Sequence, residues 1–403
     1  MSSIDLESIL SEDERAIHER VHKFAEEVMR PAGIALDALA DPEDVIADGS
    51  ILWDVYKKHD ELELEVIADP ASGFSTTQQA RLRAIISEEM GWGDSGLAIS
   101  FGVDSFPQTM ALMSGNPELI ERFGQPGRRG CWAITEPGHG SDQIRFATDP
   151  QIATLGKPNC IAKQDGDDWV ISGQKAAWVS NGSIAEAASL FCAVDRGEGI
   201  VGIGGFLVPL NDPAVSRGKA LDKIGQRALN QGELFFDGLR VPNMNLVVSP
   251  ELYTTFGDLG LSQANSGMGA VFVGVAQAAL DLAIDYAKER VQGGVPIFEH
   301  QSVKARIFEM FRKVEAARGL SRRVLEYNAL NGPKLQYAIA SKVTSTTTAF
   351  EVASAAVQIF GGNGLSREYP VEKLMRDARA SMIEDGCNEV LGIAAEFCRR
   401  CDR

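Results

Sequence analysis

The chain has 403 residues, of which 44% are hydrophobic and 24% charged, and its formal net charge is −17. This length predicts two or three substructures with a large core, and the acidic balance argues against nucleic acids and anionic membranes as partners. No apolar run approaches the length of a bilayer, so we expect no membrane span. The polar, acidic N-terminus resembles neither a secretory signal nor a transit peptide, so we expect a cytoplasmic protein.

Residues 1–128 predict an N-terminal helical domain. Ser11 and Glu14 have the spacing of a capping box, and apolar residues follow them at helical intervals. Pro31 is expected to end this first helix. A second long helix is predicted over residues 76–93, so this part of the chain is predicted to be mostly helical.

Residues 129–245 predict a middle β domain. Short runs rich in Val, Ile and Phe are bounded there by Gly, Asp, Asn and Pro, which is typical of closely spaced strands. The stretch "GEGIVG" (197–202) matches a dinucleotide-binding glycine pattern, but it leads into another strand-like run, "IGGFLVPL". Without a helix after the glycines there is no amide cradle for a pyrophosphate, so we interpret this stretch as a hairpin turn.

Residues 246–403 return to a helical pattern and predict a C-terminal bundle. The expected fold is therefore mainly α with a β middle domain. The long helices are predicted over residues 268–291, 301–328 and 334–360.

The cysteines give no metal signal. There are six, and "CRRC" (398–401) has metal or redox spacing but no second pair to complete a site. We expect no metal and reduced thiols.

Two loops carry residues suited to a ligand. "CWAITEPGHGSD" (131–142) combines glycines, hydroxyls and acids where the helical region gives way to strands. In "GQKAAWVSNG" (173–182), Trp178 and Ser180 share one face of a strand because side chains alternate. An aromatic side chain beside a hydroxyl suits a flat heteroaromatic ligand.

Together with three later stretches, these loops resemble the motifs of the acyl-CoA dehydrogenase family. The motifs occur in the family's order over nearly the whole chain, and the probability that five of them match in register by chance is very small. They are "TEPGHGSD" (135–142), "GQKAAWVSN" (173–181), "IGQRALNQGELFFDGLRVP" (224–242), "ERVQGGVPIFEHQ" (289–301) and the segment from Gln358 to Arg379.

The resemblance implies a fold, a cofactor and an activity. The fold would be an N-terminal helical domain, a β-barrel-like middle domain and a C-terminal four-helix bundle. The activity would be α,β-dehydrogenation of an acyl-CoA or acyl-carrier-protein thioester, with FAD taking the hydride at N5 and an electron-transfer flavoprotein or similar acceptor reoxidising it. The acyl group is not readable from the sequence, and a homotetramer is expected.

The resemblance also assigns cofactor contacts at matching positions. Thr135 and Ser141 would bond the flavin or the pantetheine arm, Trp178 would stack near the isoalloxazine, and Ser180 would stand beside N5. The pyrophosphate and adenosine of a neighbouring subunit's FAD would meet Arg290, Gln301, Gln358, Gly361 and Gly362, because a pyrophosphate favours a fixed guanidinium and close backbone approach.

The catalytic base falls in "MIEDGCNEVL" (382–391). Aligned on Gly386, the carboxylate directly before the glycine is Asp385 where the family often has glutamate, and Cys387 replaces the usual threonine near the cofactor. We expect Asp385 to be the base, with Glu384 as the alternative. An aspartate carboxylate stands about 1.5 Å nearer the backbone, and a misplacement near 1 Å can lower a rate on the order of a hundredfold.

Asn265 and Ala264 occupy positions where family members often carry an arginine or an alternative glutamate base. The changed residues keep other functions open. One is a related flavoenzyme with altered chemistry, such as a nitroalkane oxidase, an acyl oxidase or an eliminating enzyme; nitroalkane-oxidising relatives also read D-G-x-N but have an arginine where this chain has Gly392. The other is a non-catalytic subunit of a hetero-oligomer.

Overall fold

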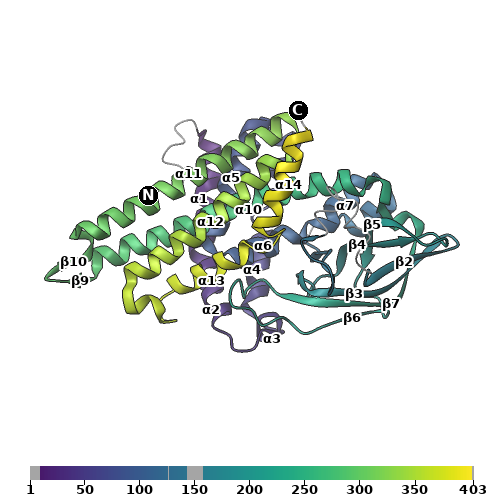
Figure 1. Ribbon diagram of the computed structural model, residues 1–403, viewed down its shortest axis with the longest axis horizontal. Helices are drawn as coiled ribbons and strands as arrows, with labels where there is room; N and C mark the ends of the chain where they lie inside the picture. The colour runs from purple at the N-terminus through teal and green to yellow at the C-terminus, as the bar shows by residue number, and fades with distance from the viewer. Residues whose placement is uncertain (1–9, 126, 143–157, 402–403) are drawn as a thin grey trace.

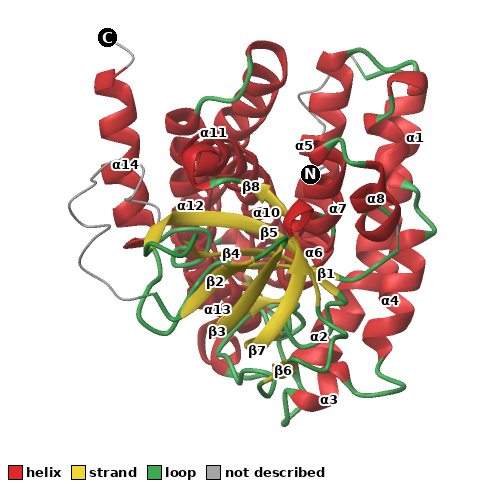
Figure 2. Cartoon of the chain, turned by 90° about the vertical axis from the view of Figure 1, so that its right-hand side faces the viewer, coloured by secondary structure: helices red, strands yellow, loops and turns green. Residues whose placement is uncertain are grey.

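A computed structural model describes residues 10–125, 127–142 and 158–401 (Figure 1). Helices from the two ends of the chain lie together, and a sheet formed by the middle of the chain lies at one end of them. Figure 2 looks onto the sheet and shows helices behind it and on both sides of it. The mainly α architecture with a β middle region confirms the expected fold class.

The N-terminal region is helical, and its first helix begins at the predicted capping box of Ser11 and Glu14. Pro31 does not end it, which corrects the sequence prediction. A π-helical turn precedes Pro31 and shifts the hydrogen-bond register, so the proline falls in the first turn of α2, where its missing N–H is tolerated. The helices are α1 (Glu12–Phe24), the π turn η1 (Ala25–Met29), α2 (Arg30–Asp37), α3 (Glu43–Ile46), α4 (Ile51–Asp60), α5 (Thr76–Gly93), α6 (Ser95–Asp104), α7 (Phe106–Ser114) and α8 (Pro117–Phe123).

The middle region forms one sheet in the order β6-β7-β3-β2-β4-β5-β8, with β1 added beside β4. Its core is separate from that of the helices and includes Trp169 and Phe206. The expected hairpin at 197–202 is confirmed, because β4 and β5 pair antiparallel on either side of it. The strands are β1 (Gly130–Ala133), β2 (Cys160–Asp165), β3 (Asp168–Ser180), β4 (Ala187–Asp195), β5 (Ile200–Pro209), β6 (Val215–Arg217), β7 (Gln231–Pro242) and β8 (Leu246–Val248).

The C-terminal region is the predicted helical bundle. Its first helix begins at Tyr253 rather than at residue 268, because packing carries it through a Gly- and Ser-containing stretch with weak periodicity. The elements are α10 (Tyr253–Glu289), the short strands β9 (Val291–Gln292) and β10 (Val295–Pro296), α11 (Gln301–Asn331), α12 (Leu335–Phe360), the 3₁₀ turn η8 (Gly361–Leu365), α13 (Val371–Ser381) and α14 (Asn388–Cys401).

Helix α10 is the central helix of the protein. By length and hydropathy it could cross a membrane, but 78% of its most apolar window is buried inside the protein, as in the core helix of a globular fold. It packs closely on α5: a Cβ at Gly274 would lie 1.9 Å from the Glu88 carbonyl oxygen, and one at Gly91 would lie 1.9 Å from that of Val271. The N- and C-terminal helices therefore share one core.

Candidate active site

The loop between α13 and α14 carries the two candidate bases. Asp385 has a φ of 50° and Gly386 a φ of 90°, so two successive residues adopt the left-handed conformation. The amide of Asn388 donates to the Met382 carbonyl at 3.0 Å and closes the loop. Left-handed backbone at a residue other than glycine is strained and is retained where the surroundings enforce it, often at functional sites.

The two carboxylates of this loop have different surroundings. Glu384 Oε1 accepts a hydrogen bond from Gln226 Nε2 at 2.6 Å. Burial and the neighbouring Asp385 charge raise the pKa of Glu384 to about 7. Asp385 is accessible to water, yet enough protein surrounds it that burial raises the pKa of its carboxyl, against the opposing charge of Lys342. Within the described residues the Asp385 carboxylate accepts no hydrogen bond, so this carboxylate is the one left available to a substrate.

Asn265 lies under the loop, on α10. It is fully buried, and its Nδ2 donates to the Leu261 carbonyl at 3.0 Å and more weakly to the Asp385 carbonyl at 3.5 Å. Its Oδ1 has no hydrogen-bond partner in the described part of the chain. Asn265, at the position where the family often has arginine, therefore contacts the Asp385 backbone through a neutral amide. Ala264 beside it offers no carboxylate, as its sequence position indicated.

One of the predicted flavin residues lies directly against this loop. Ser141 Oγ accepts a hydrogen bond from the Cys387 amide at 3.0 Å, which joins the two motif loops directly. The Ala176 amide donates to the Thr135 carbonyl at 2.9 Å and so holds the first motif against β3.

The predicted alternation on β3 is confirmed. Trp178 is 58% exposed whereas Val179 is 1% exposed, so the indole points out of the sheet. Ser180 follows on the same face, and its Oγ accepts from Gln231 Nε2 at 3.1 Å. An exposed indole beside a fixed hydroxyl fits a flat flavin ring.

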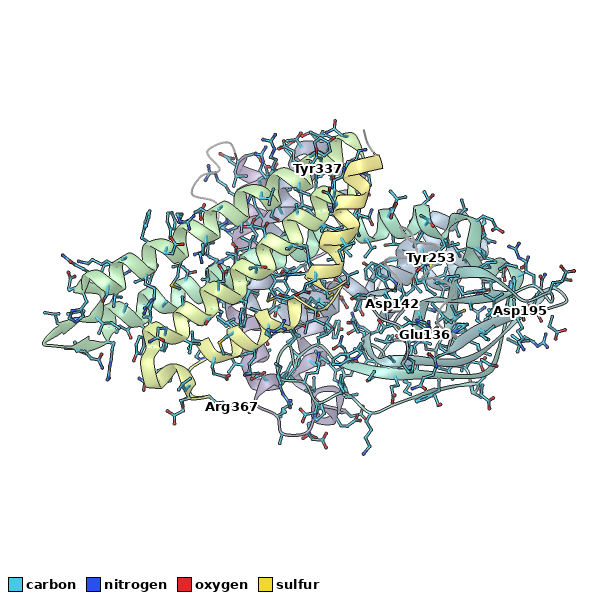
Figure 3. All side chains as sticks on the ribbon, in the orientation of Figure 1. Glu136, Asp142, Asp195, Tyr253, Tyr337 and Arg367 are labelled. Atoms are coloured by element: carbon cyan, nitrogen blue, oxygen red, sulfur yellow. The ribbon has the colours of Figure 1, made fainter. Side chains whose placement is uncertain are left out.

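A buried ion pair supports these loops and was missed from the sequence. Lys175 Nζ donates to Glu136 Oε1 at 2.7 Å and to the Ile134 carbonyl at 3.0 Å. Figure 3 shows Glu136 and Asp142 where the sheet adjoins the helices. Both members of the pair lie inside the quoted motifs, which is the signal that could have revealed them.

The remaining predicted cofactor residues lie elsewhere. In Figure 1, β9 and β10 mark the end of the helices farthest from the sheet. Tyr286 near the end of α10 donates to the Phe360 carbonyl at 3.3 Å, which brings the ends of α10 and α12 together there. The residues at this end are Arg290, Gln301, Gln358, Gly361 and Gly362, all of them exposed. Within one chain, therefore, this group lies far from Trp178.

This second group fits a pyrophosphate. Added Cβ atoms at Gly361 and Gly362 would meet nothing within 4 Å, so the backbone there presents an open face. The exposed guanidinium of Arg290 supplies the charge that a diphosphate favours. The two groups together suit the two ends of an FAD molecule.

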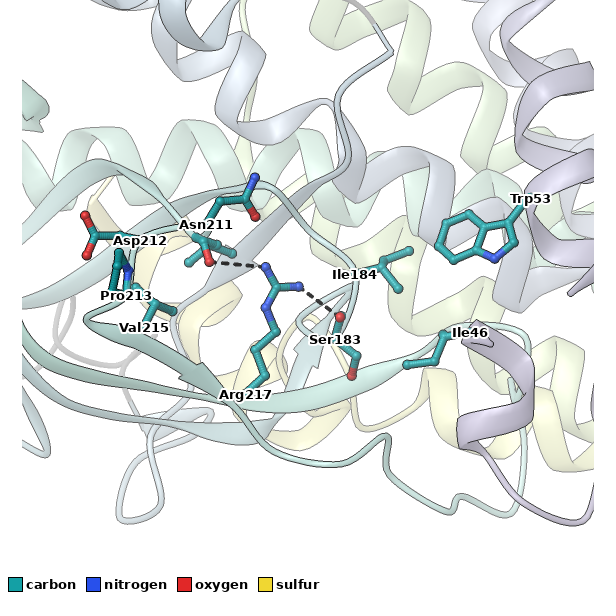
Figure 4. A pocket seen from close by; sticks show the side chains of 10 residues that line it. Ile46, Trp53, Ser183, Ile184, Asn211, Asp212, Pro213, Val215 and Arg217 are labelled. Atoms are coloured by element: carbon teal, nitrogen blue, oxygen red, sulfur yellow. Dashed lines mark hydrogen bonds between the residues drawn. The ribbon is translucent and has the colours of Figure 1, made fainter. Parts of the chain in front are cut away.

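A separate hollow of about 590 Å³ lies between Trp53 and Arg217 (Figure 4). Arg217 donates to the carbonyls of Ser183 and Ala185 at 2.9 and 2.6 Å, and to that of Leu210 at 3.3 Å. Its guanidinium is therefore used to join loops of the sheet region. None of the predicted site residues lines this hollow. Among the described residues, no group of three or more His, Cys, Asp or Glu side chains could hold a metal ion.

Comparisons with known proteins agree with this geometry. The family model described as "Acyl-CoA dehydrogenase, middle domain" matches residues 131–239, and the one described as "Acyl-CoA dehydrogenase, C-terminal domain" matches residues 260–395. The butyryl-CoA dehydrogenase structure from Megasphaera elsdenii superposes with a TM-score of 0.83 at 26% identity, covering 98% of this chain and 99% of that one.

Curated relatives include the mitochondrial short-chain specific acyl-CoA dehydrogenases. The rat protein is 32% identical over 68% of this chain, and the match spans 63% of the rat protein's length. The pig protein is 30% identical over 94% of this chain and 88% of its own length. The chain therefore belongs to the acyl-CoA dehydrogenase family.

Proposed function

We propose that the protein is an FAD-dependent acyl-CoA dehydrogenase in which Asp385 removes the α-proton of a thioester. One observation carries this proposal: the Asp385 carboxylate is accessible, is engaged in no hydrogen bond within the described residues, and lies on a loop that is bonded to the flavin-side residue Ser141. The names of the relatives support a thioester substrate.

The raised pKa of the Asp385 carboxyl suits a base. A carboxylate in water is a weak acceptor of a carbon-bound proton, and partial burial strengthens it. Glu384 is less suited, because Gln226 already bonds its carboxylate. The shorter side chain of aspartate requires the substrate α-carbon to lie nearer the loop than it would with glutamate.

The chain's own residues would hold the cofactor in two parts. Trp178, Ser180, Thr135 and Ser141 would orient the flavin ring, with the Cys387 amide beside them. Arg290 and the exposed glycines of η8 would hold the pyrophosphate of the neighbouring copy's FAD, which makes an oligomer, expected to be a homotetramer, necessary for binding. Bound FAD would accept the hydride from the β-carbon and pass the electrons to an electron-transfer flavoprotein.

Anaerobic bleaching of the purified flavoprotein tests the proposal. Wild type, Asp385→Asn and Glu384→Gln are mixed with a panel of acyl-CoA thioesters that begins with butyryl-CoA, and flavin absorbance is followed. The expected result is bleaching in wild type and in Glu384→Gln, and none in Asp385→Asn with its FAD still bound.

Other results would remove the proposal. Equal bleaching in wild type and Asp385→Asn would exclude Asp385 as the base. Bleaching lost only in Glu384→Gln would transfer the role to Glu384. No bleaching by any thioester, with oxygen consumed when nitroalkanes are added, would point to the altered chemistry instead, and a protein without FAD would point to a non-catalytic subunit.

A further inference from the structure

A buried lysine stands beneath the catalytic loop. Lys342 lies on α12, and its side chain is fully buried. Its Nζ donates to the Gly386 carbonyl at 2.8 Å and to Asn388 Oδ1 at 2.9 Å. Both acceptors follow Asp385 within three residues, so the ammonium group is fastened directly to the segment that presents the base.

An ammonium group is rarely buried without acids to compensate it. Burial lowers the pKa of Lys342 to about 8, and the charge that opposes this effect most strongly is that of Asp385. Glu384, Cys387 and Glu389 of the same segment act in the same direction, more weakly. A lysine in this position therefore has its electrostatic partners almost entirely in the catalytic loop.

The other neighbours of the loop do not replace this cation. From α10, Asn265 presents a neutral amide to the Asp385 carbonyl, and from the sheet side the Ser141 hydroxyl accepts from the Cys387 amide. Lys223 is also positive, but its charge acts on Glu384, and its Nζ donates to the Leu229 carbonyl. Lys342 is the group that opposes the effect of burial on the Asp385 carboxyl.

The backbone of the loop also needs a tether. Asp385 and Gly386 are both left-handed, and for aspartate this conformation is less favourable than the right-handed one. The bond from Lys342 to the Gly386 carbonyl acts on the peptide that links this strained pair to Cys387. Without it, the loop has less to hold the carboxylate in one place.

We propose that Lys342 is a positioning residue for the reaction: its ammonium fixes the Gly386 carbonyl and thereby the place of the Asp385 carboxylate, and its charge favours the ionised form that can accept a proton. This inference rests on the proposed function of Asp385. Lys342 itself does not touch the substrate.

The test compares flavin reduction by an acyl-CoA across pH in wild type, Lys342→Met, Lys342→Gln and Lys342→Arg. Loss of the cation should shift the acid limb of the pH–rate profile to higher pH by about one unit or more, because a nearby cation lowers a carboxyl pKa by roughly that amount. Loss of the tether should lower the plateau rate by about ten- to a hundredfold. Lys342→Arg should restore the acid limb, and Lys342→Gln, which keeps a donor but no charge, should show the shifted limb even if Lys342→Met does not fold.

Two controls separate positioning from general damage. Lys313→Met removes a lysine of α11 that bonds Glu351, away from the catalytic loop, and it should leave the acid limb in place. Hydrogen exchange measured by mass spectrometry over residues 382–388 should be faster in Lys342→Met than in wild type and unchanged in Lys313→Met.

An acid limb that stays in place in both Lys342→Met and Lys342→Gln, with FAD retained, would overturn the inference. So would unchanged exchange of the loop in Lys342→Met. Failure of the proposed function looks different, because wild type itself would then show no reduction by thioesters, or Asp385→Asn would react as wild type does.

Discussion

Gly274 lies where α10 crosses α5, and its replacement by alanine gives a sharp test of that packing. The added Cβ would stand 1.9 Å from the Glu88 carbonyl oxygen and 2.7 Å from the Trp92 amide nitrogen, whereas ordinary contact begins near 3.4 Å. Both neighbours are backbone atoms, so no side chain can rotate away. The two helices would have to separate by up to 1.5 Å, the difference between 3.4 and 1.9 Å.

Overpacking of this kind typically lowers the free energy of unfolding by about 1–3 kcal/mol. Gly267 provides the matched control on the same helix, since a Cβ there would meet nothing within 4 Å. Alanine in a helix interior is favoured over glycine by about 0.8–1 kcal/mol, so Gly267→Ala should stabilise the protein. The two substitutions are chemically identical and are expected to change stability in opposite directions.

Urea unfolding followed by far-ultraviolet circular dichroism measures both variants against wild type. The predicted order of unfolding midpoints is Gly274→Ala below wild type and Gly267→Ala above it. If both variants were stabilised, the close approach of α5 and α10 would be refuted, and with it the shared core of the N- and C-terminal helices.

Three further predictions concern charged side chains. Lys175→Met leaves the buried Glu136 carboxylate unpaired and should lower the free energy of unfolding by about 3–5 kcal/mol in urea titrations, with much of the loss regained when Glu136→Leu is added; equal losses in the single and double variants would contradict this. The hydrogen bond to Glu89 raises the pKa of His22 above 6.5, so its stabilising effect is fully present below pH 6.5 and is lost as pH rises through the raised value. His22→Gln should therefore cost more stability at about pH 6 than at about pH 9 in the same titrations, and a pH-independent loss would refute the linkage. Arg290→Ala should weaken FAD retention by about ten- to a hundredfold, measured by fluorescence on dilution, whereas Arg312→Ala, which removes an exposed arginine of α11, should not. Equal retention in both variants would remove Arg290 from the cofactor site.

Local sequence patterns predicted several local features of the fold well. The capping box at Ser11, the hairpin at 197–202 and the outward face of Trp178 depend on neighbouring residues only, and the structure has all three. Pro31 and the start of α10 were predicted wrongly, because a π turn and tertiary packing overrode the local signals.

The supporting contacts of the base were beyond sequence reasoning. Gln226 and Glu384 are 158 positions apart, and Lys342 is 44 positions from Gly386. A lysine in an amphipathic helix is ordinarily interpreted as a surface residue, and nothing near Lys342 in the sequence marks it as buried. Such pairs become visible only when the fold places α12 beneath the loop.

The separation of the two cofactor groups within one chain has a genetic consequence. Under the proposed sharing of FAD, a chain defective at Trp178 and a chain defective at Arg290 would each form inactive assemblies alone. In a mixed pair, one site would combine both defects, whereas the other would combine the intact Trp178 of one chain with the intact Arg290 of its partner. Two inactive alleles would then complement each other, with one site in each mixed pair restored.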